Sequence, residues 1–321
     1  MGETTAIILA AGKGTRMRSP LPKVLHEVCG TSLLECVLDA VREAGISRIL
    51  VVVGDKKEAV KERLAGLPVV LIEQQDQLGT AHAVMSARHI LAGLAGSVLV
   101  LNGDTPLIKP QTLKRLVAAH AEKGADVTLS TVLLDNPHGY GRILRDAHGC
   151  IQGIIEESEA SENERKNKEI NVGMYVFAVA SLLEGLEGIT PHNTKGEYYL
   201  TDIIGVFRKK GKRIEGFEVT DALEVLGINT QRELSGVNKI KQDEIIQAHM
   251  SRGVIFVAPA NTYIEDHVNI GEGTTIYPFT YIRKNVSIGR RCCIGPFVYL
   301  GTGIKLEGNV KIQNNMAMEN C

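Results

Sequence analysis

Tryptophan is absent from this 321-residue chain, and aromatic residues account for only 4% of it. So few aromatic rings argue against the stacking platforms on which single-stranded nucleic acids bind. The formal net charge is −1, so there is no excess of basic residues to attract nucleic acid or an anionic membrane. The composition therefore predicts neither a nucleic-acid partner nor a membrane partner.

The chain also lacks a long apolar stretch and paired cysteines. No apolar run approaches the roughly 20 residues needed to cross a bilayer. The first apolar run ends after Ala11 and has no basic segment before it, which predicts a buried strand rather than a signal peptide. The cysteines form no CxxC pair and have no histidine spacing suited to a metal; they are Cys29, Cys36, Cys150, Cys292, Cys293 and Cys321. We therefore expect reduced, mostly structural thiols in a cytoplasmic protein.

Apolar runs alternate with helical periodicity over the first two-thirds of the chain. The expected strands are residues 5–10, 48–53, 69–72 and 97–101, and the expected helices are residues 32–43, 80–91 and 110–122. This alternation is typical of βαβ units around a largely parallel sheet, in which ligands bind outside the carboxyl ends of the strands. The sequence predicts an α/β ligand-binding domain over residues 1–230 and a polar connecting helix within residues 231–252.

Beyond residue 253 an aliphatic side chain recurs at every sixth position. The nine positions are Ile264, Ile270, Ile276, Ile282, Ile288, Ile294, Leu300, Leu306 and Ile312. Neither a helical period nor an ordinary strand period explains this spacing, whereas hexapeptide repeats do, because each repeat supplies one short strand with one inward aliphatic. A short left-handed parallel β-helix over residues 253–321 is the prediction. Self-association is also expected, since a solenoid cannot bury its ends alone.

The first expected strand leads into a glycine-rich basic loop. Gly12 and Gly14 let the backbone approach an anion closely. Four positive charges lie within eleven residues of this near-neutral chain: Lys13, Arg16, Arg18 and Lys23. Such charge suits the pyrophosphate that leaves a nucleoside triphosphate, although a solvated basic loop is the alternative interpretation. Walker-type and dinucleotide-binding loops are disfavoured, because no lysine follows Gly14 in the required register and Met17 stands where the third glycine of a dinucleotide motif belongs.

Asp104 directly follows another expected strand end, in the segment LNGD at residues 101–104. A carboxylate there is suited to hold a hard cation that bridges phosphate oxygens. The alternative role is to cap a turn, which aspartate does generally. Because the basic loop also follows a strand end, we expect the metal role, with Mg²⁺ as the cofactor.

Several segments together resemble one family. LAAGKGTRM at residues 9–17, followed by LPK at 21–23, looks like the signature of sugar nucleotidyltransferases. The match is narrowed by QLGTAHA at 77–83, GYGR at 139–142, EINVG at 169–173 and GEYYLTD at 196–202. Together they resemble the bacterial bifunctional N-acetylglucosamine-1-phosphate uridyltransferase/glucosamine-1-phosphate acetyltransferase family. The resemblance implies a Rossmann-like nucleotidyltransferase domain with a mixed, mostly parallel sheet. It further implies Mg²⁺-dependent transfer of uridylyl from UTP to N-acetylglucosamine 1-phosphate, release of pyrophosphate, and a homotrimer.

The same resemblance implies roles for individual residues. The nucleotide site falls on Leu9, Ala10, Ala11, Gly12, Lys23, Gln74, Gly79 and Thr80. The sugar-phosphate site falls on Asn102, Gly103, Asp104, Gly141, Glu156, Asn171 and Asn229. The implied metal ligands are Asp104 and Asn229, and the implied catalytic residues are Arg16, Lys23 and Asp104. Asn102 departs from the aromatic or small hydroxyl residue often found there in the family, which bears on sugar specificity.

Two alternative functions stay open. Another sugar 1-phosphate, or dTTP instead of UTP, would use the same chemistry. A non-catalytic trimeric scaffold built on the hexads is an alternative of another class. Acetyl transfer is not expected, because the hexads form only about three coils and His267, in the first coil, is the one histidine among them.

Overall fold

The computed structural model describes residues 3–191, 193 and 196–319, which divide into two compact units. The N-terminal unit comprises Met1–His26 and Leu33–Asn229, and the C-terminal unit comprises Glu27–Ser32 and Thr230–Cys321. The C-terminal unit thus takes in the polar helix α9 (Gln231–Met250), which begins one residue after Thr230. It also takes in residues 27–32, which the sequence division had assigned to the first domain, because the hydrogen bonds of this segment join it to α9 and to the solenoid.

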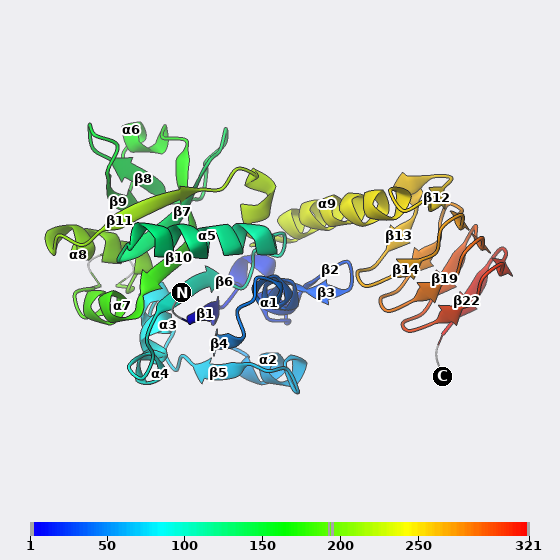
Figure 1. Ribbon diagram of the computed structural model, residues 1–321, viewed down its shortest axis with the longest axis horizontal. Helices are drawn as coiled ribbons and strands as arrows, with labels where there is room; N and C mark the ends of the chain where they lie inside the picture. The colour runs from blue at the N-terminus through cyan, green and yellow to red at the C-terminus, as the bar shows by residue number, and fades with distance from the viewer. Residues whose placement is uncertain (1–2, 192, 194–195, 320–321) are drawn as a thin grey trace. The chain divides into compact units, whose positions relative to one another are not determined.

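One nine-stranded sheet forms the centre of the N-terminal unit (Figure 1). Its strands are β1 (Thr4–Ala10), β4 (Arg48–Val53), β5 (Val70–Glu73), β6 (Ser97–Asn102), β7 (Val127–Leu133), β8 (Arg142–Arg145), β9 (Ile151–Ile155), β10 (Glu169–Ala178) and β11 (Ile214–Glu218). The main path runs β11-β7-β10-β6-β1-β4-β5, while β8 pairs with β10 and β9. Strand β10 is antiparallel to β6 and β7, and the other four pairs along the path are parallel. The predicted mixed, mostly parallel sheet is confirmed.

Helices cover both faces of this sheet. Successive strand residues point to opposite faces, so Ile8 packs in one apolar core and Ile7 in the other. The first core includes side chains of α1 (Leu33–Glu43), α2 (Lys57–Arg63) and α5 (Pro110–Lys123). The second includes side chains of α3 (Thr80–Ser86), α4 (Arg88–Leu91), α7 (Val179–Leu186) and α8 (Ile203–Lys209). Among the described residues no helix is long and apolar enough to span a membrane.

Most predicted elements agree with the structure to within one residue, but the single helix expected over residues 80–91 is wrong. The structure has two helices there, α3 and α4, with Ala87 between them. The Ala87 N–H donates to the carbonyl of Val84, three residues back, over 3.0 Å. This tighter turn interrupts the four-residue ladder of an α-helix, which apolar spacing alone does not reveal.

Parallel stacking of two- and three-residue strands builds the solenoid of the C-terminal unit. The strands are β12 (Ile255–Phe256), β13 (Tyr263–Ile264), β14 (Asn269–Ile270), β15 (Thr275–Ile276), β16 (Tyr281–Ile282), β17 (Ser287–Ile288), β18 (Cys293–Ile294), β19 (Val298–Leu300), β20 (Lys305–Leu306), β21 (Lys311–Ile312) and β22 (Met316–Met318). They form three parallel sheets, in which residues eighteen apart pair, such as Ile264 with Ile282. The nine hexad positions are buried, except for the half-buried Leu306, and the β-helix prediction is confirmed.

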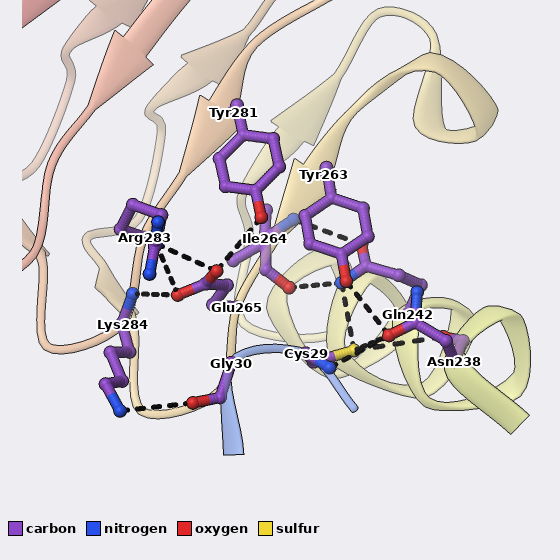
Figure 2. Close-up of polar contacts among 10 residues, drawn as sticks. All are labelled: Cys29, Gly30, Asn238, Gln242, Tyr263, Ile264, Glu265, Tyr281, Arg283 and Lys284. Carbon is purple, nitrogen blue, oxygen red and sulfur yellow. Dashed lines mark hydrogen bonds and ion pairs between the residues drawn. The ribbon is translucent and has the colours of Figure 1, made fainter. Parts of the chain in front are cut away.

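A short hairpin from the N-terminal part of the sequence is built into this unit, formed by β2 (Glu27–Val28) and β3 (Thr31–Ser32) (Figure 2). The Cys29 N–H donates to Asn238 Oδ1 of α9 over 2.9 Å, and the Asp266 N–H donates to the Cys29 carbonyl over 2.8 Å. Burial raises the pKa of the Cys29 thiol to about 11, so this thiol stays protonated and unreactive at neutral pH.

Glu265 anchors the turn of that hairpin from the solenoid side (Figure 2). Its buried carboxylate accepts hydrogen bonds of 2.9 Å from Tyr281 Oη and from Arg283 Nε. The backbone N–H of Lys284 donates to the same carboxylate, and Lys284 Nζ donates to the Gly30 carbonyl over 3.1 Å. Gly30 has a φ of +79°, and a Cβ there would lie 2.5 Å from Glu265 Oε2, so only glycine fits this turn. Cys29, Cys36, Cys150, Cys292 and Cys293 are not in disulfides, and Cys321 lies outside the described residues.

Candidate active site

Two adjoining clefts open at the carboxyl ends of β1 and β6 in the N-terminal unit. The first has a volume of about 430 Å³ and is lined by Leu9, Ala10, Ala11, Gly12, Lys13, Gly14, Thr15, Arg16, Lys23, Val24, Gln74, Gln77, Gly79, Thr80, Ala83, Asn102, Asp104, Glu197, Tyr199 and Asn229. All eight residues expected at the nucleotide are in this lining, and so is Arg16. The location agrees with the rule that open α/β sheets bind ligands beyond the carboxyl ends of their strands.

The glycine-rich loop follows β1 and is held by local geometry. Gly14 has a φ of +59° and precedes the short 3₁₀ turn Thr15–Met17, whose Met17 side chain is buried. A Cβ on Gly14 would lie 2.7 Å from Lys23 Cβ, so glycine lets the two segments approach each other. No atom lies within 4 Å of the position of a Cβ on Gly12, which lines the cleft. The loop backbone is therefore accessible to an anion in the first cleft.

Arg16, Lys23, Asp104 and Asn229 form one polar cluster in this cleft. Lys23 Nζ makes an ion pair with the Asp104 carboxylate and donates to Asn229 Oδ1 over 3.1 Å. Arg16 Nη2 donates to the same Asn229 oxygen over 2.8 Å. The Ile228 N–H donates to the Asp104 carbonyl over 3.0 Å, which holds the segment before Asn229 against the end of β6. Three distant parts of the sequence thus bring two cations to two oxygen-bearing side chains.

The two oxygen-bearing side chains fit a magnesium ion. A carboxylate and an amide carbonyl are hard oxygen donors, and Mg²⁺ is commonly bound by one or two such protein ligands plus phosphates and water. In this structure the Asp104 carboxylate pairs with Lys23, and Asn229 Oδ1 accepts from both Lys23 and Arg16, so each oxygen accepts a positively charged partner. Among the described residues no group of three or more histidine, cysteine, aspartate or glutamate side chains could hold a metal. Asp104 and Asn229 therefore suit a magnesium ion that is also bound by a phosphate of the substrate, rather than one bound by protein side chains alone.

Gln74 and Gly79 also line the first cleft. Gln74 is 3% exposed, and its Nε2 donates to the Gly79 carbonyl over 3.1 Å. Gly79 has a φ of +107°, and a Cβ there would lie 2.5 Å from the Tyr198 carbonyl oxygen. Thr80 Oγ1 accepts a hydrogen bond of 2.9 Å from the Leu200 N–H. Residues 74–80 are thereby fastened to residues 198–200.

The second cleft, of about 240 Å³, collects the residues expected at the sugar phosphate. Its lining includes Asn102, Asp104, Gly141, Glu156, Asn171 and Asn229. Thr201 Oγ1 donates to Glu156 Oε1 over 3.1 Å, and the Asn171 N–H donates to the Gly141 carbonyl over 2.8 Å. Five residues line both clefts and join them: Leu9, Thr80, Asn102, Asp104 and Asn229.

Gly103 is the one expected site residue that lines neither cleft. Its N–H donates to the Leu9 carbonyl over 3.0 Å, and a Cβ there would lie 3.3 Å from Leu34 Cδ1. Gly103 therefore lies against the core beneath the site, because the turn after β6 directs its neighbours outward. Its role is to keep that turn tight between Asn102 and Asp104.

Several lining residues were not identified from the sequence. Gln77, Glu197 and Tyr199 line the first cleft, and Tyr140, Tyr175 and Thr201 line the second. Most belong to the segments QLGTAHA, GYGR and GEYYLTD, so the motifs contained them without distinguishing which side chains face a ligand. Burial, together with the carboxylates of Glu197 and Glu156, raises the pKa of Tyr199 to about 12. Its phenol is therefore a neutral hydrogen-bond donor at physiological pH.

Comparison with known families agrees with this geometry. Residues 6–194 match the MobA-like NTP transferase domain family. Residues 267–302 match the family described as bacterial transferase hexapeptide (six repeats). The first match contains the glycine-rich loop, Asp104 and most of the lining of both clefts, and the second falls within the solenoid.

Individual relatives are similar over both units. Three proteins named "Bifunctional protein GlmU" are each 46% identical to this chain. Those of Pelotomaculum thermopropionicum and Clostridium perfringens match over 277 and 273 residues, or 86% and 85% of the chain. That of Caldanaerobacter subterraneus matches over 278 residues, or 87% of the chain. The chain spans about 60% of the length of each of these relatives. By the match over most of its N-terminal unit, this chain belongs to the family of MobA-like NTP transferase domains.

Proposed function

We propose that the N-terminal unit transfers uridylyl from UTP to N-acetylglucosamine 1-phosphate, with Mg²⁺ as the cofactor. The observation that carries this proposal is the pair of adjoining clefts that share Asp104 and Asn229. A reaction between a nucleoside triphosphate and a phosphorylated sugar needs two such sites with a cation position between them. The resemblance of the loop and cleft segments to sugar nucleotidyltransferases supports the same chemistry.

In this proposal the chain supplies positioning and charge rather than a covalent group. An oxygen of the sugar phosphate attacks the α-phosphorus of UTP, a new P–O bond forms, and the bond to the β-phosphate oxygen breaks to release pyrophosphate. Arg16 and Lys23 bind the leaving pyrophosphate and offset its growing negative charge. Asp104 and Asn229 would hold Mg²⁺, which when bound neutralises phosphate charge next to the reacting atoms. No general base is required, because the attacking phosphate is already an anion.

The uracil base is assigned to the first cleft and the sugar to the second. Gln74 is a suitable reader of uracil, since an amide offers both a donor and an acceptor to the edge of the base. Glu156 and Asn171 are suited to bind the hydroxyl and amide groups of the sugar. We expect the protein in the cytoplasm, because the spacing of its cysteines indicates reduced thiols rather than disulfide pairs. Acetyl transfer is not part of this proposal.

Pyrophosphate release from the purified full chain tests the proposed reaction. We expect release only when UTP, N-acetylglucosamine 1-phosphate and Mg²⁺ are all present, because each cleft must be filled and the charge between them offset. Chelation by EDTA should stop the reaction, and added Mg²⁺ should restore it. Equal or faster turnover with ATP, CTP or dTTP would contradict the uridine assignment. Faster turnover with another sugar 1-phosphate would contradict the sugar assignment.

The C-terminal unit is proposed to form a homotrimer. Exposed large apolar side chains lie on the solenoid of a single chain: Ile255, Val257, Tyr277, Phe279, Phe297 and Met316. The Phe279 and Phe297 rings stack with centroids 5.0 Å apart although both are more than half exposed. Exposed apolar clusters of this kind are typical of surfaces that associate.

Light scattering on the full chain measures this association. We expect a mass of three 34.8 kDa chains at micromolar concentration. Phe297→Ser should shift the equilibrium towards monomer by removing a stacked exposed ring, whereas Leu133→Ser, at an exposed leucine of the N-terminal unit, should not. A monomeric mass at high micromolar concentration would disprove the trimer.

A further inference from the structure

Arg142 is a fully buried arginine beside the second cleft. Its side chain is 1% exposed, and it is the first residue of β8, directly after the cleft residue Gly141. Its backbone pairs with Ile155 of β9 and with Ile170 of β10. Both partners directly precede cleft residues in the chain, since Glu156 follows Ile155 and Asn171 follows Ile170. Arg142 thus lies where the three expected sugar-phosphate segments meet.

The guanidinium of Arg142 fastens these segments to one another. Nη1 donates to the Tyr140 carbonyl in the loop that lines the cleft. Nη2 donates to the Arg165 carbonyl at the end of α6 (Glu162–Arg165) over 3.3 Å. The same Nη2 lies 2.6 Å from Glu157 Oε2, in an ion pair. One side chain therefore joins the loop before β8, the segment after β9 and the end of α6.

Glu157 completes the link from the other side. Burial opposes ionisation of this carboxyl, but the positively charged Arg142 beside it lowers its pKa. Glu157 is therefore ionised at neutral pH. Glu157 directly follows Glu156 in the chain, so its ion pair links the Glu156 segment to the arginine that binds the Tyr140 carbonyl. The pair braces the loop against the segment that carries Glu156.

We propose that Arg142 and Glu157 are positioning residues for sugar-1-phosphate recognition: their ion pair sets the distance between the Gly139–Gly141 loop and Glu156. Neither residue is in the lining of the first cleft or of the second. Loss of the pair should therefore loosen one cleft and leave the other unchanged. This inference rests on the proposed function, because it assigns the second cleft to the sugar phosphate.

Steady-state kinetics of two variants separate this role from a merely structural one. Glu157→Gln keeps the shape of the side chain and removes its charge, and Arg142→Lys keeps the charge and removes the forked geometry. For each variant we expect the KM for N-acetylglucosamine 1-phosphate to rise at least fivefold, while the KM for UTP stays within twofold of the unaltered chain. Arg142→Lys should have the larger effect, since a lysine cannot reach all three partners at once.

A matched ion pair elsewhere in the same unit provides the control. Glu35 in α1 pairs with Arg63 at 2.6 Å, and its side chain is 23% exposed against 26% for Glu157. Glu35→Gln removes a comparable charge, but Glu35 lines neither cleft. Both KM values of this variant should therefore stay within twofold of the unaltered chain. Thermal melting of all variants shows whether the fold is retained. If Arg142→Lys fails to fold, Glu157→Gln still decides, because the Glu157 side chain is partly exposed and the substitution keeps its shape.

The outcomes are distinct. A rise confined to the KM for the sugar phosphate supports the positioning role. An equal rise in both KM values, a fall in kcat alone, or no change in Glu157→Gln would overturn it. Absence of turnover by the unaltered chain with UTP and N-acetylglucosamine 1-phosphate would instead contradict the proposed function.

Discussion

Lys23→Ala and Asp104→Asn are each expected to lower kcat/KM for pyrophosphate release by at least about a hundredfold. Lys23 contacts both Asp104 and Asn229, and Asp104 is the only carboxylate that lines both clefts among the described residues. Each substitution removes a charge that lines the first cleft before the phosphates bind. A charge that is fixed in place before the reaction lowers the activation free energy most when it lies next to charge that develops in the transition state.

Both variants should fold, because the Lys23 and Asp104 side chains are 17% and 16% exposed and the partner left behind can be solvated. Circular dichroism and thermal melting check this directly. Lys57→Ala is the matched control, since Lys57 also forms an ion pair, with Glu73, but lies outside both clefts. Near-normal kcat/KM in either site variant would show that the residue has been assigned the wrong role.

Gly79→Ala should impair both stability and activity. Alanine does not readily adopt a φ of +107° with a ψ of 178°, and its Cβ would overlap the Tyr198 carbonyl at 2.5 Å. Such backbone strain costs about 1–3 kcal/mol, which lowers the melting temperature of a unit this size by roughly 2–12 °C. Relief of the overlap moves residues 74–80 away from Tyr198, and a displacement of about 1 Å at a reactive site can cost about a hundredfold in rate.

Gly205→Ala is the control for this substitution. Gly205 lies within α8, and no atom lies within 4 Å of its Cβ position. Alanine is favoured over glycine inside a helix, so the melting temperature should stay equal or rise slightly and kcat/KM should not change. If Gly79→Ala melts and reacts like the unaltered chain, the contact with Tyr198 does not constrain the cleft.

Local features of the sequence determined most of the secondary structure. Continuous apolar runs predicted β1, β4, β5 and β6 to within one residue. The runs of β1, β4 and β6 reflect burial on both faces of the sheet, whereas β5 lies at its edge and is only partly buried. Pro110 and Gly124 bound α5 as its N1 residue and its left-handed C-cap, so both ends could be read from residue type. The hexad period likewise specified the solenoid, since each coil repeats the same inward position.

The pattern was incomplete at both ends of the solenoid. Phe256 pairs with Ile276 and Met318 pairs with Leu300, so both stack on the predicted aliphatic ladder although neither was counted in it. Phe256 is twenty residues from its partner rather than eighteen, because a 3₁₀ turn, Pro259–Asn261, lengthens the first coil. A fixed period cannot detect a coil of different length.

Tertiary structure decided which distant residues share a site. Asn229 has no local signal of its own and was named only by family resemblance, yet it receives hydrogen bonds from Arg16 and Lys23, more than 200 residues earlier. Family resemblance also predicted Gly103 in the site, but the turn directs it towards the core. The hairpin at residues 27–32 belongs with the solenoid although it lies early in the chain. Residue type and periodicity are properties of a few neighbouring positions, so the sequence determined the strands, helix ends and repeat of this protein. The meeting of Arg16, Lys23, Asp104 and Asn229 depends on strand order and on the path of each turn, which are determined only when the whole sheet is assembled.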